Sequence, residues 1–153
     1  MSDSELRPQH YLYRDRHTDE DYARLAAQFG ASYMSSAKWF KVLTAIAQSR
    51  LHLQRATWKF IDSDRLFPWP PPGAHELELT HLADCGSFPP IEYKWIEWIS
   101  FPRTWSELPD PKRPQQTVSG AQDIDALARL LDATAQTQYI IDDDGLTLFA
   151  YRH

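Results

Sequence analysis

The chain has 153 residues, of which 42% are hydrophobic and 24% charged, and its formal net charge is -5. This composition favours one globular domain over a disordered chain, and no apolar run reaches the ~20 residues of a membrane-spanning helix. The polar, acidic N-terminus lacks the features of a signal or transit peptide, and a single cysteine, Cys85, excludes an internal disulfide. We therefore expect a cytoplasmic protein with no membrane partner.

Apolar periodicity predicts a leader, one domain and three helices. Residues 1–17 have no apolar period, so we expect a loosely ordered leader there and a single domain at 18–153. Thr18 fits the N-cap of the first helix, because a threonine oxygen can accept a hydrogen bond from a free N–H group of the first turn. The helices are predicted at 19–29, from a cap at Ser35 or Ser36 to about Arg50, and at 121–135.

Strands are predicted where apolar residues recur at every second position instead of at helical spacing. They are expected at 56–61, 75–82, 91–101, 139–141 and 146–151. The segment 91–101 is apolar on both faces, which indicates a central strand covered on both sides. Two proline-rich segments, 68–72 and 102–114, are predicted to be loops. The order α-α-β-β-β-α-β-β favours an α+β fold with a mainly antiparallel sheet of about five strands flanked by three helices.

Charge is unevenly distributed along the chain. Residues 25–61 contain five bases and no acid, whereas residues 62–100 contain seven acids and two bases. An acidic chain is a poor general binder of nucleic acid, because phosphate contacts dominate that affinity. The basic stretch 38–59 nevertheless leaves a nucleic-acid or regulatory adaptor open as an alternative. The simpler interpretation is that these bases pair with the acidic second half across the fold.

The sequence contains none of the common cofactor or metal motifs. The five glycines form neither GxGxxG nor a P-loop, and there is no HExxH. His75 and His81 would lie ~20 Å apart along an extended strand, too far to share a metal. The run Asp142–Asp144 lacks the alternating acids and closing glutamate of an EF-hand. We therefore expect no cofactor and no metal site.

A small hydrolase-type enzyme is the second alternative. Cys85 with His81, or Glu97 with a histidine, could in principle act together, but there is no GxSxG motif. Glu97 lies on an otherwise apolar strand face, where burial would require a partner such as Lys38 or Arg55. No catalytic residue is assigned.

Several short motifs resemble a family of small uncharacterised bacterial proteins. Within residues 34–151 they are Lys38-Trp39, the strand Trp58-Lys59-Phe60-Ile61-Asp62, Ile96-Glu97-Trp98-Ile99 and Leu148-Phe149-Ala150-Tyr151. Proteins of this kind are similar to the immunity proteins that bacteria make against toxins. The resemblance implies a non-enzymatic binding protein that neutralises a cognate toxin by capping its active site, and it implies no catalytic residue.

The partner-binding surface is expected to be acidic and to include loop aromatics. Acidic groups would attract a basic, nuclease-like toxin, and a loop tryptophan is costly to expose unless it packs back or meets a partner. The predicted partner-binding residues are Trp69, Glu76, Glu78, Trp105, Asp142, Asp143 and Asp144. The last strand, 146–151, could be a sheet edge that pairs with another chain, so a homo-oligomer stays open.

Overall fold

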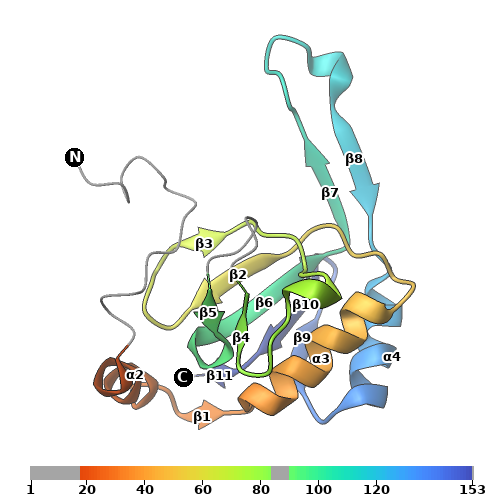
Figure 1. The fold of residues 1–153 in the computed structure, drawn as a ribbon. Helices are drawn as coiled ribbons and strands as arrows, with labels where there is room; N and C mark the ends of the chain where they lie inside the picture. Colours follow the sequence, from red (N-terminus) through yellow and green to blue (C-terminus); the bar gives the residue numbers. More distant parts are fainter. Residues whose placement is uncertain (1–17, 84–89, 153) are drawn as a thin grey trace, which may run out of the picture.

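The computed structural model describes residues 18–83 and 90–152, so the predicted leader at 1–17 lies outside the described residues. Its main sheet has five antiparallel strands in the order β3-β2-β6-β10-β9 (Figure 1). Their bounds are Leu66–Phe67 for β3, Thr57–Phe60 for β2, Ile96–Pro102 for β6, Gly145–Phe149 for β10 and Gln138–Ile141 for β9. With the three helices of the described residues, this sheet confirms the expected α+β fold.

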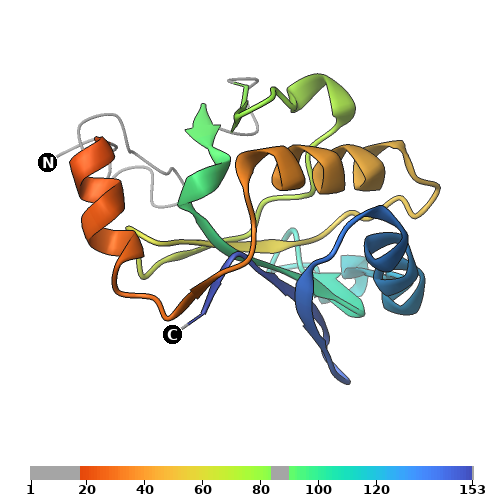
Figure 2. The same cartoon turned by 90° about the horizontal axis from the view of Figure 1, so that it is seen from below.

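Two helices form the layer that covers this sheet. Helix α3 (Ser36–Gln48) lies over one side of the sheet, and α4 (Ile124–Thr134) packs beside α3 and against β10 (Figure 2). None of the helices in the described part of the chain has the length and hydropathy of a membrane-spanning segment.

Alternation along the strands builds the core between the sheet and the helices. One row of apolar side chains crosses all five strands, comprising Phe67, Trp58, Ile99, Leu148 and Tyr139. Helix α3 contributes Trp39, Val42, Leu43 and Ile46, and α4 contributes Ile124, Leu127 and Leu131. Each fully buried apolar side chain of this size stabilises the fold by roughly 1.5–3 kcal/mol, so this layer holds the domain together.

The remaining elements are short. Three two-stranded sheets join β1 (Ala31–Ser32) to β11 (Tyr151–Arg152), β4 (His81–Leu82) to β5 (Ile91–Glu92), and β7 (Thr104–Glu107) to β8 (Val118–Ala121). Three single 3₁₀ turns are η1 (Ala74–Glu76), η2 (Tyr93–Trp95) and η3 (Pro114–Gln116).

Two predicted strands are wrong in detail. Segment 91–101 is interrupted by η2, which places both Tyr93 and Trp95 in the core, and the long strand β6 begins only at Ile96. Segment 75–82 is broken by η1, where the carboxylate of Glu76 accepts a hydrogen bond from the Gly73 N–H at 2.9 Å. In a capped turn, a side chain of the same segment accepts a hydrogen bond from a backbone N–H group that would need a neighbouring strand in a sheet. This local hydrogen bond therefore favours the turn over the strand.

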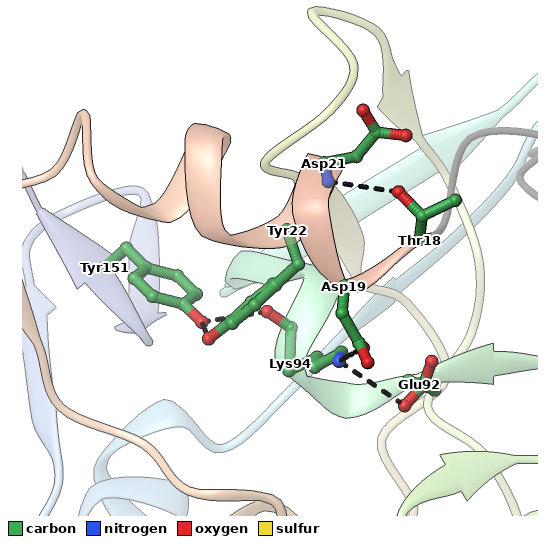
Figure 3. A network of polar contacts seen from close by, with 7 residues as sticks. All are labelled: Thr18, Asp19, Asp21, Tyr22, Glu92, Lys94 and Tyr151. Atoms are coloured by element: carbon green, nitrogen blue, oxygen red, sulfur yellow. Dashed lines mark hydrogen bonds and ion pairs between the residues drawn. The ribbon is translucent and has the colours of Figure 1, made fainter.

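The first helix, α2 (Asp19–Ala26), begins as predicted and is held by a hydroxyl cluster (Figure 3). Thr18 Oγ1 accepts the N–H of Asp21 at 3.1 Å, which confirms the N-cap. The hydroxyls of Tyr22 and Tyr151 are hydrogen-bonded, and Tyr151 donates to the carbonyl of Lys94 at 2.9 Å. Since the Tyr151 proton goes to that carbonyl, Tyr22 is the donor in the pair. Burial raises the pKa of Tyr151 above its ordinary value, so its hydroxyl stays protonated.

The side chain of Lys94 completes this cluster. Its ammonium lies 4.6 Å from the ring centroid of Tyr22 and 3.2 Å from a carboxylate oxygen of Asp19. Both contacts lead to α2, so the cluster docks that helix against the body of the domain.

Candidate partner-binding surface

The main sheet has one face that the core does not cover, which we call the open face. One row of side chains crosses all five strands there, comprising Leu66, Lys59, Trp98, Phe149 and Gln138, and a second row comprises Thr57, Ser100, Thr147 and Ile140. All nine are partly or fully exposed, whereas their neighbours on the α3 side are almost all buried. The segment 91–101 therefore contains a central strand, as predicted, but β6 is covered on one side only.

Two aromatic side chains lie at the centre of the open face. Trp98 of β6 and Phe149 of β10 are direct cross-strand neighbours, and both remain partly exposed. The guanidinium of Arg152 lies 4.8 Å from the ring centroid of Phe149. Aromatic residues are enriched at the centres of protein–protein interfaces, whereas the rim around them is polar.

An ion pair neutralises this part of the face. Lys59 Nζ lies 2.9 Å from a carboxylate oxygen of Glu97, with 16% and 14% of the two side chains exposed, and it also donates to the carbonyl of Phe60 at 2.8 Å. The strand register shifts between Lys59 and Phe60, where they face β6. The expectation that Lys38 or Arg55 partners Glu97 is therefore wrong.

Two of the predicted partner-binding residues belong to the interior. Trp69 is only 7% exposed, and its ring centroid lies 5.0 Å from that of Phe67 and 5.6 Å from that of Phe60. Its carbonyl accepts the indole N–H of Trp58 at 3.0 Å. Glu76 is 9% exposed and caps η1. The expected surface positions of Trp69 and Glu76 are thus wrong, because aromatic packing and a local cap satisfy these side chains internally.

The other predicted acids are exposed but divided between two places. Glu78 follows η1, on the α3 side of the sheet, whereas Asp142–Asp144 form the turn between β9 and β10 on the opposite side (Figure 2). Within the turn, one oxygen of Asp142 accepts the N–H groups of Asp144 and Gly145 at 2.8 and 3.1 Å. The structure therefore does not combine the two acidic segments into one face.

Trp105 lies on β7, near the end of the β7–β8 hairpin that is attached to the body of the domain. The guanidinium of Arg55 lies over its ring at 3.9 Å from the centroid and forms an ion pair with Glu107 at 2.7 Å. On the neighbouring strand, a Cβ at Gly120 would come within 2.5 Å of the indole, so only glycine leaves room for it. Trp105 is half-buried by these contacts, and its role in binding a partner stays a prediction.

The described residues show no arrangement of side chains that supports the enzyme alternative. Cys85 lies outside them, and His81 is half-buried with its Nδ1 3.2 Å from the hydroxyl of Thr80. Glu97 is paired with Lys59. In the described ranges 18–83 and 90–152, no group of three or more histidine, cysteine or carboxylate side chains could hold a metal ion.

Three of the five basic side chains in the stretch 38–59 form hydrogen bonds or ion pairs within the domain. Lys38 donates to the carbonyls of Tyr33 and Gln136, and Arg55 and Lys59 pair with acids from the second half of the chain. This confirms the expected pairing for these two bases.

A search of protein-family models, of curated proteins and of solved structures found no match to the chain.

Proposed function

We propose that this protein is a non-enzymatic binding protein that holds a partner protein on the open face. The observation that carries the proposal is the partly exposed pair Trp98 and Phe149 at the centre of that face. Solvent-exposed aromatic surface is costly in a free protein and becomes favourable when a partner removes it from water. The small polar residues Thr57, Ser100 and Thr147 around the pair can form a rim with satisfied hydrogen bonds.

The proposed class is an immunity protein that neutralises a cognate toxin by capping its active site. The sequence resemblance supports this class, and the net charge of -5 supports a basic, nuclease-like toxin as the partner. Opposite net charges accelerate the encounter of two proteins and disfavour wrong partners. In this proposal, electrostatics bring the toxin to the protein and the aromatic pair anchors it.

Affinity capture with matched variants tests the proposal. Tagged wild-type protein, the double variant Trp98→Ala/Phe149→Ala and the control Leu79→Ala are each exposed to the native cell lysate. Leu79 is 71% exposed and lies on the α3 side of the sheet, between η1 and β4. We expect one stoichiometric partner on the wild type and the control, and at least about a hundredfold weaker binding to the double variant, since two central aromatic anchors are removed.

A growth assay then separates an immunity protein from other binding proteins. The captured partner is expressed in a sensitive strain, alone and with each form of this protein. Rescue of growth by the wild type and by Leu79→Ala, but not by the double variant, is the expected result. Undiminished capture by the double variant would overturn the open-face proposal, and a captured partner that is harmless to the cell would overturn the immunity class.

A further inference from the structure

The hairpin formed by β7 and β8 projects from the body of the domain (Figure 1). We call residues 104–121 the arm, residues 108–117 its tip, and the part next to Pro102 and Gln122 its root. All tip residues are exposed except Asp110, which is half-buried. A two-stranded hairpin on its own is marginally stable in water, so an arm of this kind gains stability from a surface that covers it.

The root of the arm is firmly tied to the domain. Gln122 is 9% exposed, and its side-chain oxygen accepts the N–H groups of Gln54 and Arg55 at 2.7 and 2.8 Å. Its side-chain nitrogen donates to the carbonyl of Pro102 at 2.7 Å. These bonds join both strands of the root to the segment before β2, so the direction of the arm is set before any partner arrives.

The arm and the edge strand β9 carry four of the six exposed large hydrophobic residues in the described part of the chain. Leu108 and Val118 of the arm are 44% and 48% exposed, and Ile140 and Ile141 of β9 are 43% and 40% exposed. In the main sheet, β9 is the last strand and pairs only with β10. Its outer backbone groups therefore form an edge on which another strand can add.

The same two segments carry opposite charges. Lys112 and Arg113 lie at the tip of the arm together with Asp110, whose carboxylate lies 3.7 Å from Arg113 Nε, so the tip keeps an excess of one positive charge. The acidic turn Asp142–Asp144 lies at the root, because Arg103 donates its backbone N–H to the carbonyl of Asp144 at 2.8 Å and its Nε–H to the carbonyl of Asp142 at 3.0 Å. Basic tip and acidic root are thus at opposite ends of one arm, and they cannot meet within one copy because the arm points away from the body (Figure 1).

We propose that a second copy of this chain covers the arm. Two copies related by a two-fold axis lay their arms side by side in opposite directions, so that each basic tip reaches the other copy's acidic turn. About eight residues of extended chain separate root from tip, a reach of roughly 25 Å. The arrangement places Leu108 and Val118 of one copy near Ile140 and Ile141 of the other, and a two-fold axis makes both contacts at once. It shares Ile140 with the margin of the open face but uses neither aromatic residue of that face, and it does not rest on the proposed function.

Sedimentation velocity of the purified full chain tests this proposal. We expect a concentration-dependent dimer whose dissociation constant rises as salt increases, since exposed charge pairs are screened. Two charge-reversal variants are compared: the tip variant Lys112→Glu/Arg113→Glu and the turn variant Asp143→Lys/Asp144→Lys. Asp142 is left intact because it holds the turn together. Each variant alone should dimerise at least about tenfold more weakly, because every tip then faces a turn of the same sign.

An equimolar mixture of the two variants gives the decisive result. In a heterodimer each reversed tip meets a reversed turn and each natural tip meets a natural turn, so dimerisation should return to the wild-type level. Lys41→Glu on the exposed side of α3 is the control, with wild-type dimerisation expected. A wild-type protein that remains monomeric at all concentrations overturns the proposal. Variants that fold, as judged by circular dichroism, but dimerise like the wild type, or a mixture that fails to recover, also overturn it.

Discussion

The guanidinium of Arg55 lies 3.9 Å from the ring centroid of Trp105, although 49 residues separate the two in the chain. Arg55 also forms an ion pair with Glu107, two residues further along β7. One side chain from the segment before β2 thus holds the base of the arm by stacking and by charge. A planar guanidinium can make both contacts at once, which a lysine ammonium cannot.

Replacement of Arg55 should therefore loosen the arm more than the domain. We expect Arg55→Ala to accelerate amide hydrogen exchange in β7 and β8 by about fivefold to tenfold, with a cost of about 1 kcal/mol or less in global stability, because both partners are half-exposed. Arg55→Lys keeps the charge and should recover only part of the protection. Unchanged exchange in both strands of the arm would contradict this role.

Gln122 is predicted to be the most important polar side chain at the root. Gln122→Leu keeps a similar volume but leaves the N–H groups of Gln54 and Arg55 and the carbonyl of Pro102 without the partners they have now. We expect a loss of about 2–4 kcal/mol in the free energy of unfolding, measured by urea titration. The exposed Gln116 provides the matched control, since Gln116→Leu should change stability by less than about 0.5 kcal/mol. Equal effects of the two substitutions would refute the assignment.

Two tryptophans on opposite faces of the sheet should differ sharply in their contribution to stability. Trp58 is fully buried, so Trp58→Ala should cost about 3–5 kcal/mol. Trp98 lies on the open face, and Trp98→Ala should cost less than about 1.5 kcal/mol because part of its surface is already in water. Urea unfolding of the two variants measures the difference. A loss at Trp98 as large as that at Trp58 would mean that the open face is part of the core.

Asp62 should make the protein less stable as the pH rises. Burial raises the pKa of Asp62 to about 6, so the folded state binds a proton between pH 4 and pH 6 that the unfolded state has already released. This contribution to stability is present below the unfolded pKa of about 3.9 and is lost as the pH rises through about 6. With allowance for solvent screening we expect about 1 kcal/mol.

The comparison for Asp62 is with Asp62→Asn, which removes the titration. Unfolding free energies of both proteins from pH 4 to pH 8 should diverge, with the wild type losing more stability than the variant as the pH rises. Parallel curves over this range would show that Asp62 titrates normally.

Much of the fold could be predicted because its signals are local. Helices α3 and α4 follow from apolar residues at helical spacing, and α3 also from the predicted cap at Ser35. Asp123 caps α4, so this helix begins three residues later than predicted. The alternation in β2, with Trp58 and Phe60 buried and Lys59 half-exposed, likewise follows from a period of two. These patterns need no knowledge of what lies on the other side of the sheet.

The loop prediction for 102–114 is wrong where this segment forms the first strand of the arm, because the signal for that strand is not local. Prolines in 102–114 indicate irregular backbone, but Thr104–Glu107 forms a strand by pairing with Val118–Ala121, which lies beyond that segment. The same holds for Trp69: prolines on both sides predict exposure, whereas three aromatic rings from β2 and β3 bury it.

The sequence by itself determined the α+β class, the starts of α2 and α3 and the alternation of the main strands, because periodicity and capping act within a few residues of the chain. Only the tertiary structure decided that Glu97 pairs with Lys59, that the acids at 78 and at 142–144 are separated, and that the sheet keeps one face open. These outcomes depend on which strands become neighbours and on which side the helices pack. That choice is made by the total burial of apolar surface across the whole domain, which no single segment encodes.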